Sequence, residues 1–325
     1  MIRPAPLPKT ETGLSASAPP AQRSAERPAP GSLAAWVLAC RPQTLIVGVV
    51  PVLLGAALAH QAGAVRGLAV LAALLGAVFI QIGTNLANDV FDYEKGADTE
   101  ARLGPLRVTQ AGLLTPRAMR AGMWLSFGLA MLCGVYLTAV AGPAVVAIGL
   151  VSIASGLAYT AGPYPLGYNG LGDVFVFVFF GPVAVCGTVF VSAGAAPALA
   201  SLPILASLPV GALAAAVLVV NNVRDHRTDV VAGKRTLVVR LGRRFGVGLY
   251  FALIGLAYVV PVLLVLTARL SFFGLLPLLS APLSLPLLRV VAVAHDGDRL
   301  NRTLAKTAQL LLVFGLLWVL AIGLS

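Results

Sequence analysis

The sequence predicts an all-α, polytopic membrane protein with about nine transmembrane helices in one bundle and a functional site at its cytoplasmic face. The first observation is composition: 58% of the 325 residues are hydrophobic and the mean hydropathy is +0.92, values typical of integral membrane proteins. The second is that the apolar runs are about 20 residues long, which is the length that a helix needs to cross a bilayer. The third is that these runs lack the alternating pattern of an outer-membrane barrel, so the spans are expected to be helical.

The first segment of the chain is not expected to fold. Residues 1–32 are rich in proline, alanine and serine and contain no apolar core segment, which argues against a signal peptide and indicates a disordered tail. Residues 33–325 are expected to form a single transmembrane domain. Its nine apolar spans are expected at 34–59, 67–91, 118–140, 143–161, 171–193, 203–222, 245–267, 271–292 and 304–324.

The distribution of charge predicts the orientation. If the tail is cytoplasmic, all 23 lysines and arginines except Arg66 and Arg269 lie on the cytoplasmic side. Lysine and arginine accumulate on that side of membrane proteins, so we expect a cell-membrane protein with its N-terminus in the cytoplasm and its C-terminus outside. The formal net charge of +11 is then explained by orientation and by contact with anionic lipid headgroups. No nucleic-acid partner is expected.

Two acidic stretches interrupt this apolar sequence. Residues 85–98, NLANDVFDYEKGAD, place four carboxylates at the end of a span in a chain that is only 11% charged. Residues 221–240, NNVRDHRTDVVAGKRTLVVR, repeat the arrangement of asparagine, two aspartates, glycine and a basic segment. Four expected spans separate the two stretches, an even number that returns the chain to the same side of the membrane. The sequence therefore predicts two weakly repeated, parallel halves.

Each acidic stretch is expected to present a strip of oxygen atoms. Residues spaced by three or four positions share one face of a helix. The members of the two strips are Asn85, Asp89 and Asp92, and Asn221, Asp225 and Asp229. Oxygen ligands without cysteine or histidine suit magnesium, which commonly bridges a few carboxylates to substrate phosphates. The strips therefore predict a Mg²⁺ site at the mouth of the bundle.

Basic residues follow both strips and indicate what the metal would help to bind. They are Lys95, Arg102 and Arg107 after the first strip, and Arg224, Lys234 and Arg235 after the second. Cations beside metal-binding carboxylates form a site for a diphosphate. Each buried CH₂ group contributes about 0.8 kcal/mol, so an apolar chamber below such a site would retain a polyprenyl chain. A polyprenyl diphosphate at the bilayer surface is the expected substrate.

A simpler interpretation exists for each residue alone. A carboxylate at a helix end is commonly a solvated loop residue, and a basic residue there is commonly an orientation signal. Glu94, Glu100 and His226 are interpreted in this way. Two matched strips favour a working site for the aspartates.

The two motifs, NDVFDYEKGAD and RDHRTDVVAGKRT, resemble those of the UbiA superfamily of intramembrane aromatic prenyltransferases, over essentially everything from residue 35 onward. CRPQTL at 40–45, YTAGPYPLGYNGLG at 159–172 and LNRTLAKTAQ at 300–309 look most like the branch that acts on 1,4-dihydroxy-2-naphthoate in menaquinone biosynthesis. The resemblance implies magnesium-dependent ionisation of an allylic diphosphate and attack by an aromatic carbon. In this branch CO₂ is lost and a demethylmenaquinol is formed.

The resemblance also implies roles for individual residues. The implied metal ligands are Asn85, Asp89, Asp92, Asp225 and Asp229, with Asn88, Asp98 and Asn221 as secondary candidates. The implied diphosphate-binding residues are Arg107, Lys234 and Arg235. Tyr159 corresponds to a family tyrosine near the reacting carbons and, with the four aspartates of the strips, is expected to be catalytic.

The acceptor pocket is less constrained by the sequence. The loop 159–172 contains no lysine or arginine, so an acceptor carboxylate would have to pair with Arg41 or another base. Tyr164, Tyr168 and Asn169 could line this pocket, although the surrounding glycine and proline residues equally predict a tight turn.

Two other functions remain open at this point. The first is a prenyltransferase of the same superfamily with another acceptor, such as 4-hydroxybenzoate, homogentisate or haem. The second is a secondary transporter that binds ions through its repeated acidic residues. Such transporters usually place carboxylates in the middle of broken helices, whereas these carboxylates fall at helix ends.

Overall fold

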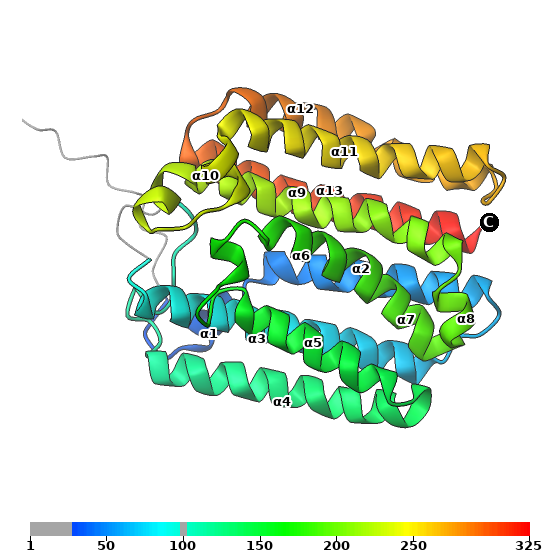
Figure 1. Ribbon diagram of the computed structural model, residues 1–325, viewed down its shortest axis with the longest axis horizontal. Helices are drawn as coiled ribbons and strands as arrows, with labels where there is room; N and C mark the ends of the chain where they lie inside the picture. The colour runs from blue at the N-terminus through cyan, green and yellow to red at the C-terminus, as the bar shows by residue number, and fades with distance from the viewer. Residues whose placement is uncertain (1–27, 98–102) are drawn as a thin grey trace, which may run out of the picture.

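The computed structural model describes residues 28–97 and 103–325. Its long helices run side by side in a single bundle (Figure 1), and every regular element in these two ranges is helical. The prediction of an all-α membrane fold is confirmed. Most of the predicted tail, residues 1–27, and the candidates Asp98, Glu100 and Arg102 lie outside the described residues.

The elements follow the chain in a simple order. The first half comprises α1 (Leu33–Cys40), α2 (Pro42–Gln61), α3 (Gly67–Glu94), α4 (Pro116–Ala141), α5 (Ala144–Ala158), η1 (Leu166–Tyr168), α6 (Gly172–Val178), η2 (Phe179–Val183) and α7 (Ala184–Ala193). The second half comprises α8 (Ala195–Ala198), α9 (Ser201–Val231), α10 (Leu237–Leu241), α11 (Arg243–Leu266), η3 (Phe272–Ser280), α12 (Ala281–Val293) and α13 (Gly297–Gly323).

The number of membrane crossings differs in one detail from the expectation. Within the described ranges, eight continuous helical segments are long and apolar enough to cross a bilayer. The fourth predicted span, 143–161, corresponds to α5, which has only 15 residues and is shorter than the roughly 20 that a full crossing needs. All nine predicted apolar segments contain helices, but nine full crossings are not confirmed.

The first predicted span is divided at Arg41. Helix α1 ends there and α2 begins at Pro42, because proline disfavours a helical conformation in the residue before it. Arg41 instead adopts a left-handed conformation with φ 51°, which is uncommon for a residue with a side chain. The break separates the short α1 from the bundle helix that follows it.

The long helical segment Gly172–Ala193 contains an irregular turn. Between α6 and α7 the chain forms the π-helical η2, with Pro182 inside it, and proline removes one helical hydrogen bond. Here the segment lies against α9 at very short range: a Cβ atom added to Gly181 would lie 3.1 Å from the Cα of Gly211. Small residues allow membrane helices to approach in this way.

Helices α3 and α9 carry the two acidic stretches, and they run toward the same end of the bundle (Figure 1). Both continue past their predicted apolar spans, α3 to Glu94 and α9 to Val231. The motif residues are therefore helical, as the spacing predicted. Helix α9 lies at the centre, where most of its length is buried, and Trp318 of α13 donates a hydrogen bond to the carbonyl of Ala206 at 2.9 Å.

Candidate active site

A cavity of about 630 Å³ opens at the end of the bundle where α3 and α9 carry their acidic residues. The polar residues that these two helices contribute to its lining are Gln81, Thr84, Asn85, Asn88, Asp92, Asn221, Asn222, Asp225 and Asp229. Asn88 and Asp92 on α3 match Asp225 and Asp229 on α9, because both pairs are four positions apart and share a helical face. The structure thus joins the two sequence motifs in one site.

Asp89 has a different environment from its neighbours. It is only 1% exposed, and its two carboxylate oxygens accept hydrogen bonds from the backbone amides of Val108 and Thr109, at 3.1 and 3.0 Å. It is not part of the cavity lining. In this geometry Asp89 anchors the loop that follows α3, and the residue of the first motif that faces the cavity beside Asp92 is Asn88.

Asn85 lines the cavity, but its amide nitrogen is already used. It donates to the carbonyl of Cys40 and to the hydroxyl of Thr44, both at 2.9 Å. These contacts connect α3 to the break between α1 and α2. Asn85 therefore holds Arg41, which also lines the cavity, at the edge of the site.

Asp92 is the centre of a polar network. Its carboxylate accepts from Arg107 at 2.8 Å and from the hydroxyl of Tyr168 at 2.7 Å, and the amine of Lys234 lies 3.5 Å away. Lys95 and Lys234 also lie over the Tyr168 ring, 5.0 and 4.7 Å from its centroid. Three cations from separate segments therefore gather around one buried carboxylate.

Lys95 is the third cation of this group, and the turn that follows α5 holds its side chain. Its amine donates to the carbonyl of Thr160, and the Thr160 hydroxyl donates to Asn88. Partial burial lowers the pKa of Lys95; the negative Asp92 opposes this shift, and the nearby Lys234 adds to it. Cations that are held close together and partly buried are typical of a site that binds an anion.

Asp225 of the second strip is neutralised from within its own helix. Arg224 is 3% exposed and donates to both carboxylate oxygens of Asp225, at 2.7 and 2.5 Å. It also donates to Asn221 at 2.6 Å and to Asn301 of α13 at 2.7 Å. Such a bidentate pair fixes the orientation of the carboxylate.

Three other candidates lie away from the cavity. The backbone amide of Arg235 donates to the carbonyl of Tyr168 at 2.6 Å, but its exposed side chain is not part of the lining. Tyr164 is 58% exposed, and Asn169 donates to the carbonyl of Pro165 within its own turn. For Tyr164 and Asn169 the tight-turn interpretation agrees with this geometry, whereas Tyr168 reaches the cavity.

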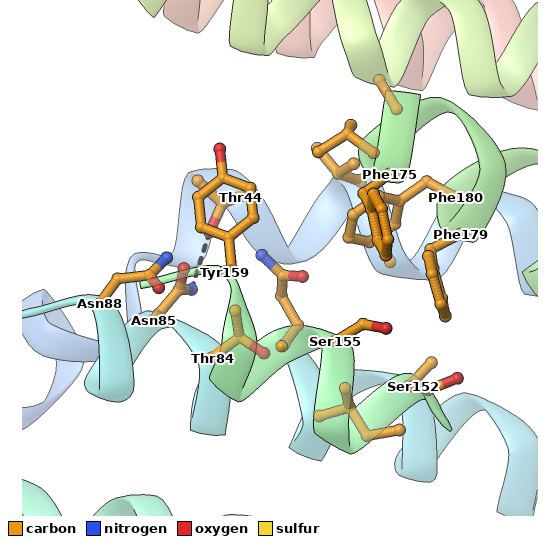
Figure 2. Close-up of a pocket in the computed structure, with 18 of the residues that line it drawn as sticks. Thr44, Thr84, Asn85, Asn88, Ser152, Ser155, Tyr159, Phe175, Phe179 and Phe180 are labelled. Carbon is orange, nitrogen blue, oxygen red and sulfur yellow. Dashed lines mark hydrogen bonds between the residues drawn. The ribbon is translucent and has the colours of Figure 1, made fainter. Parts of the chain in front are cut away.

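Below the polar end the cavity is apolar and aromatic. Figure 2 shows Tyr159 near Asn85 and Asn88, with Phe175, Phe179 and Phe180 farther along the cavity. Phe175 and Phe179 stack with their ring centroids 5.8 Å apart. The arrangement provides a charged mouth above a largely apolar chamber.

Two glycines make room for the Tyr159 ring. A Cβ atom added to Gly167 would lie 2.8 Å from its Cε1, and one added to Gly172 would lie 3.0 Å from its hydroxyl oxygen. Both distances are shorter than ordinary van der Waals contact. The glycines of the loop after α5 therefore set the position of this tyrosine.

Several members of the site could not be found from the sequence. Thr160 and Asn301 are polar residues with no special spacing, and their roles arise only where α5 and α13 pack against the motif helices. The buried Asp173 accepts hydrogen bonds from Asn222, a residue of the cavity lining, at 3.2 and 3.4 Å. A carboxylate directly after a glycine-rich loop was the only available signal for it.

The chain was compared with known proteins. The UbiA prenyltransferase family matches residues 48–314. The 1,4-dihydroxy-2-naphthoate octaprenyltransferases of Mycobacterium tuberculosis and Escherichia coli are each 38% identical over 298 residues, which cover 90% of this chain and 96% of each relative.

Solved structures show the same fold at much lower identity. A UbiA homolog from Aeropyrum pernix has a TM-score of 0.67 at 13% identity and covers 86% of this chain and 98% of its own. A UbiA homolog from Archaeoglobus fulgidus, bound to DMAPP and Mg²⁺, has a TM-score of 0.56 at 15% identity and covers 87% and 98%.

Proposed function

This chain belongs to the UbiA prenyltransferase family and is a membrane-embedded prenyltransferase; from this premise, we propose that its acceptor is 1,4-dihydroxy-2-naphthoate. The proposed reaction transfers a polyprenyl group from its diphosphate to the naphthoate ring, with loss of CO₂, and gives a demethylmenaquinol. The relatives that carry this activity by name support the acceptor, because they match this chain along almost its full length.

The observation that carries the proposal is the division of the cavity into two parts. Its mouth combines Asp92, Asp225 and Asp229 with Lys234 and Arg107, and its interior is lined mainly by aromatic and aliphatic side chains. A diphosphate with a long apolar tail has the same two parts. The charge distribution of the sequence would place the mouth at the cytoplasmic face.

The donor atoms of the cavity fit magnesium. Asn88, Asp92, Asp225 and Asp229 offer only oxygen donors suitable for this ion, and among the described residues no three acidic, histidine or cysteine side chains form a closed metal site. Magnesium typically uses one or two carboxylates and completes its coordination with water and substrate phosphates. When bound, it would neutralise charge on the diphosphate as that group leaves.

The cations at the mouth would act on the same leaving group. As the allylic C–O bond breaks, its electron pair departs with the diphosphate, and negative charge builds on the phosphate oxygens. Lys234 and Arg107 are held by Asp92, and fixed donors of this kind stabilise developing charge without reorganisation. Lys95 would add a third positive charge from the end of α3.

The apolar chamber would protect the allylic cation until the acceptor attacks. Phe175, Phe179 and Tyr159 present aromatic surfaces in the cavity, and such surfaces attract a cation while excluding water. The ring carbon that carries the carboxylate then forms the new C–C bond. The bond to the carboxylate breaks, CO₂ leaves, and its electron pair restores the aromatic ring.

Product analysis tests the proposal directly. Membranes that contain this protein are expected to convert 1,4-dihydroxy-2-naphthoate and a polyprenyl diphosphate into a product whose mass equals that of the prenylated acceptor minus CO₂. Conversion is expected to stop when EDTA removes divalent cations and to return with added Mg²⁺. Mass spectrometry of the extracted lipid gives the acceptor, the decarboxylation and the prenyl length together. Prenylation of 4-hydroxybenzoate but not of the naphthoate would overturn the acceptor assignment.

Replacement of Gly172 by alanine tests the placement of Tyr159. The added methyl group would press against the tyrosine hydroxyl, and a displacement of about 1 Å near reacting groups can cost about 100-fold in rate. We expect turnover to fall by up to about 100-fold while the melting temperature changes little. Gly248→Ala on α11 is the matched control, because a Cβ atom there meets open space. Wild-type turnover in Gly172→Ala would show that the position of Tyr159 is not critical.

A further inference from the structure

A second cavity, of about 460 Å³, lies between α12 and α13 and shares no residue with the candidate active site. One wall is apolar and comes from α12, where Pro282, Pro286 and Val290 line it. The other wall comes from the first turns of α13 and carries three cations, Arg299, Arg302 and Lys306. We call this cavity the α12–α13 groove.

The three cations form a single row. They lie at positions i, i+3 and i+7 of α13, a spacing that aligns side chains on one face of a helix. All three are exposed, and no carboxylate among the described residues forms an ion pair with them. Their charge is therefore available to a ligand.

Two acidic residues, Asp296 and Asp298, come just before the row in the sequence. Among the described residues Asp298 forms no ion pair with the row, and Asp296 has another role. The carboxylate of Asp296 caps the N-terminus of α13, where it accepts from the backbone amides of Asp298 and Arg299 at 3.1 and 3.3 Å. The facing end of α12 is held by Arg243, which donates to the carbonyls of Val291 and Ala294 at 2.9 and 2.6 Å. The two helix termini at this end of the groove are thus fixed within the protein.

The row of three cations extends farther along the helix than is usual for basic residues that only set the orientation of a membrane protein. Seven residues of helix separate Arg299 from Lys306, which corresponds to about 10 Å along the axis. The headgroup layer on each side of a bilayer is only about 5–8 Å thick. If the N-terminus of α13 lies among the headgroups, a row of this length reaches the edge of the hydrocarbon core, where an unpaired cation is costly.

From this combination we infer that the α12–α13 groove binds an anionic phospholipid. The phosphate headgroup would contact Arg299, Arg302 and Lys306, and an acyl chain would lie along the α12 wall beside Leu283. Basic pockets between membrane helices bind anionic headgroups in this way. The occupant needs both a negative headgroup and an apolar tail, because the groove offers a charged wall and an apolar wall over the same length.

The groove adjoins the active site through one residue. Asn301 lies between Arg299 and Arg302 on α13, accepts a hydrogen bond from Arg224 at 2.7 Å, and donates to the carbonyl of Leu103 at 2.7 Å. A lipid bound in the groove would therefore stabilise the turn of α13 that supports the second aspartate strip.

Lipid retention by the full-length protein tests this inference. The protein is reconstituted in phosphatidylcholine bilayers that contain a minor fraction of phosphatidylglycerol, extracted with mild detergent, and examined by native mass spectrometry. We expect wild-type protein to retain phosphatidylglycerol in preference to phosphatidylcholine. In R299Q/R302Q/K306Q the preference should fall by about fivefold for each cation removed. Arg289→Gln, an exposed α12 cation outside the groove, should leave it unchanged.

A second variant separates lipid binding from loss of folding. Leu283→Trp fills the apolar wall and leaves all three cations in place, so it should also reduce phosphatidylglycerol retention. An unchanged lipid preference in the triple variant would overturn the inference. Displacement of the lipid by inorganic phosphate would also overturn it, because it would indicate a site for a soluble anion. A third contrary result would be a wild-type dimer that retains no lipid and that dissociates in the triple variant, because the groove would then be a contact between two copies of the protein. Because the measurement is lipid mass and not turnover, it is independent of the proposed reaction.

Discussion

Replacement of Asp92 by asparagine is expected to lower turnover by about 100- to 1000-fold, the cost of removing one electrostatic contribution from a preorganised site. Asparagine keeps the size of the side chain but removes the charge that would hold magnesium and that now holds Arg107 and Lys234. The measurement is product formation by purified protein at saturating substrate and magnesium. Melting temperature in the same detergent reports folding.

Asp89→Asn is the matched control on the same helix. Asp89 accepts two backbone amides, and an asparagine in its place can accept only through one oxygen. We expect the free energy of unfolding to fall by about 1–3 kcal/mol, as for a buried group that loses a hydrogen bond. The turnover of the folded fraction should stay within about tenfold of wild type. If Asp89→Asn is fully folded and as inactive as Asp92→Asn, Asp89 belongs to the metal site and Asn88 does not replace it.

Arg224→Met is expected to destabilise the protein by about 3–5 kcal/mol, because it leaves the buried carboxylate of Asp225 without its partner. Arg224→Lys keeps the positive charge but cannot reproduce the fork that contacts both oxygens of Asp225 and reaches Asn221 and Asn301. We therefore expect an intermediate loss of stability for lysine. Thermal unfolding in detergent, followed by circular dichroism, measures both variants.

The control for this series is Arg227→Met, one turn further along α9, where the side chain is exposed. Its melting temperature should be close to that of wild type, since surface charges contribute little. Equal melting temperatures for Arg224→Met and Arg227→Met would show that the Arg224 contacts do not stabilise the fold. A folded Arg224→Met variant should still lose turnover, because Asp225 would no longer be held in one orientation.

The helical bundle could be predicted because its signals are local. An apolar run of about 20 residues specifies a membrane helix whatever surrounds it, and the places of the apolar segments were correct. The break at Arg41 was also encoded locally by Pro42, but the apolar run continues through it and hides the signal. The shortness of α5 was not visible, since the loop after it is itself apolar and glycine-rich.

The presence of two oxygen-rich strips was likewise readable from spacing, but which residues face the cavity was not. Asn88 and Asp89 are neighbours in the sequence, and a helix turns by about 100° between them. The backbone amides of Val108 and Thr109 donate hydrogen bonds to Asp89, and the Thr160 hydroxyl donates one to Asn88. These partners come from two loops that the motif does not specify.

The sequence by itself therefore determined that this protein lies in the membrane, that its helices bring two matched acidic strips to one end, and that those strips resemble the prenyltransferase motifs. Each of these properties depends on composition or on spacing along a single helix. Only the tertiary structure decided that Asn88 and not Asp89 faces the cavity, that Arg224 rather than solvent neutralises Asp225, and that Arg299, Arg302 and Lys306 face an apolar wall. The physical reason is that burial and pairing of a polar group depend on which distant segment packs against it.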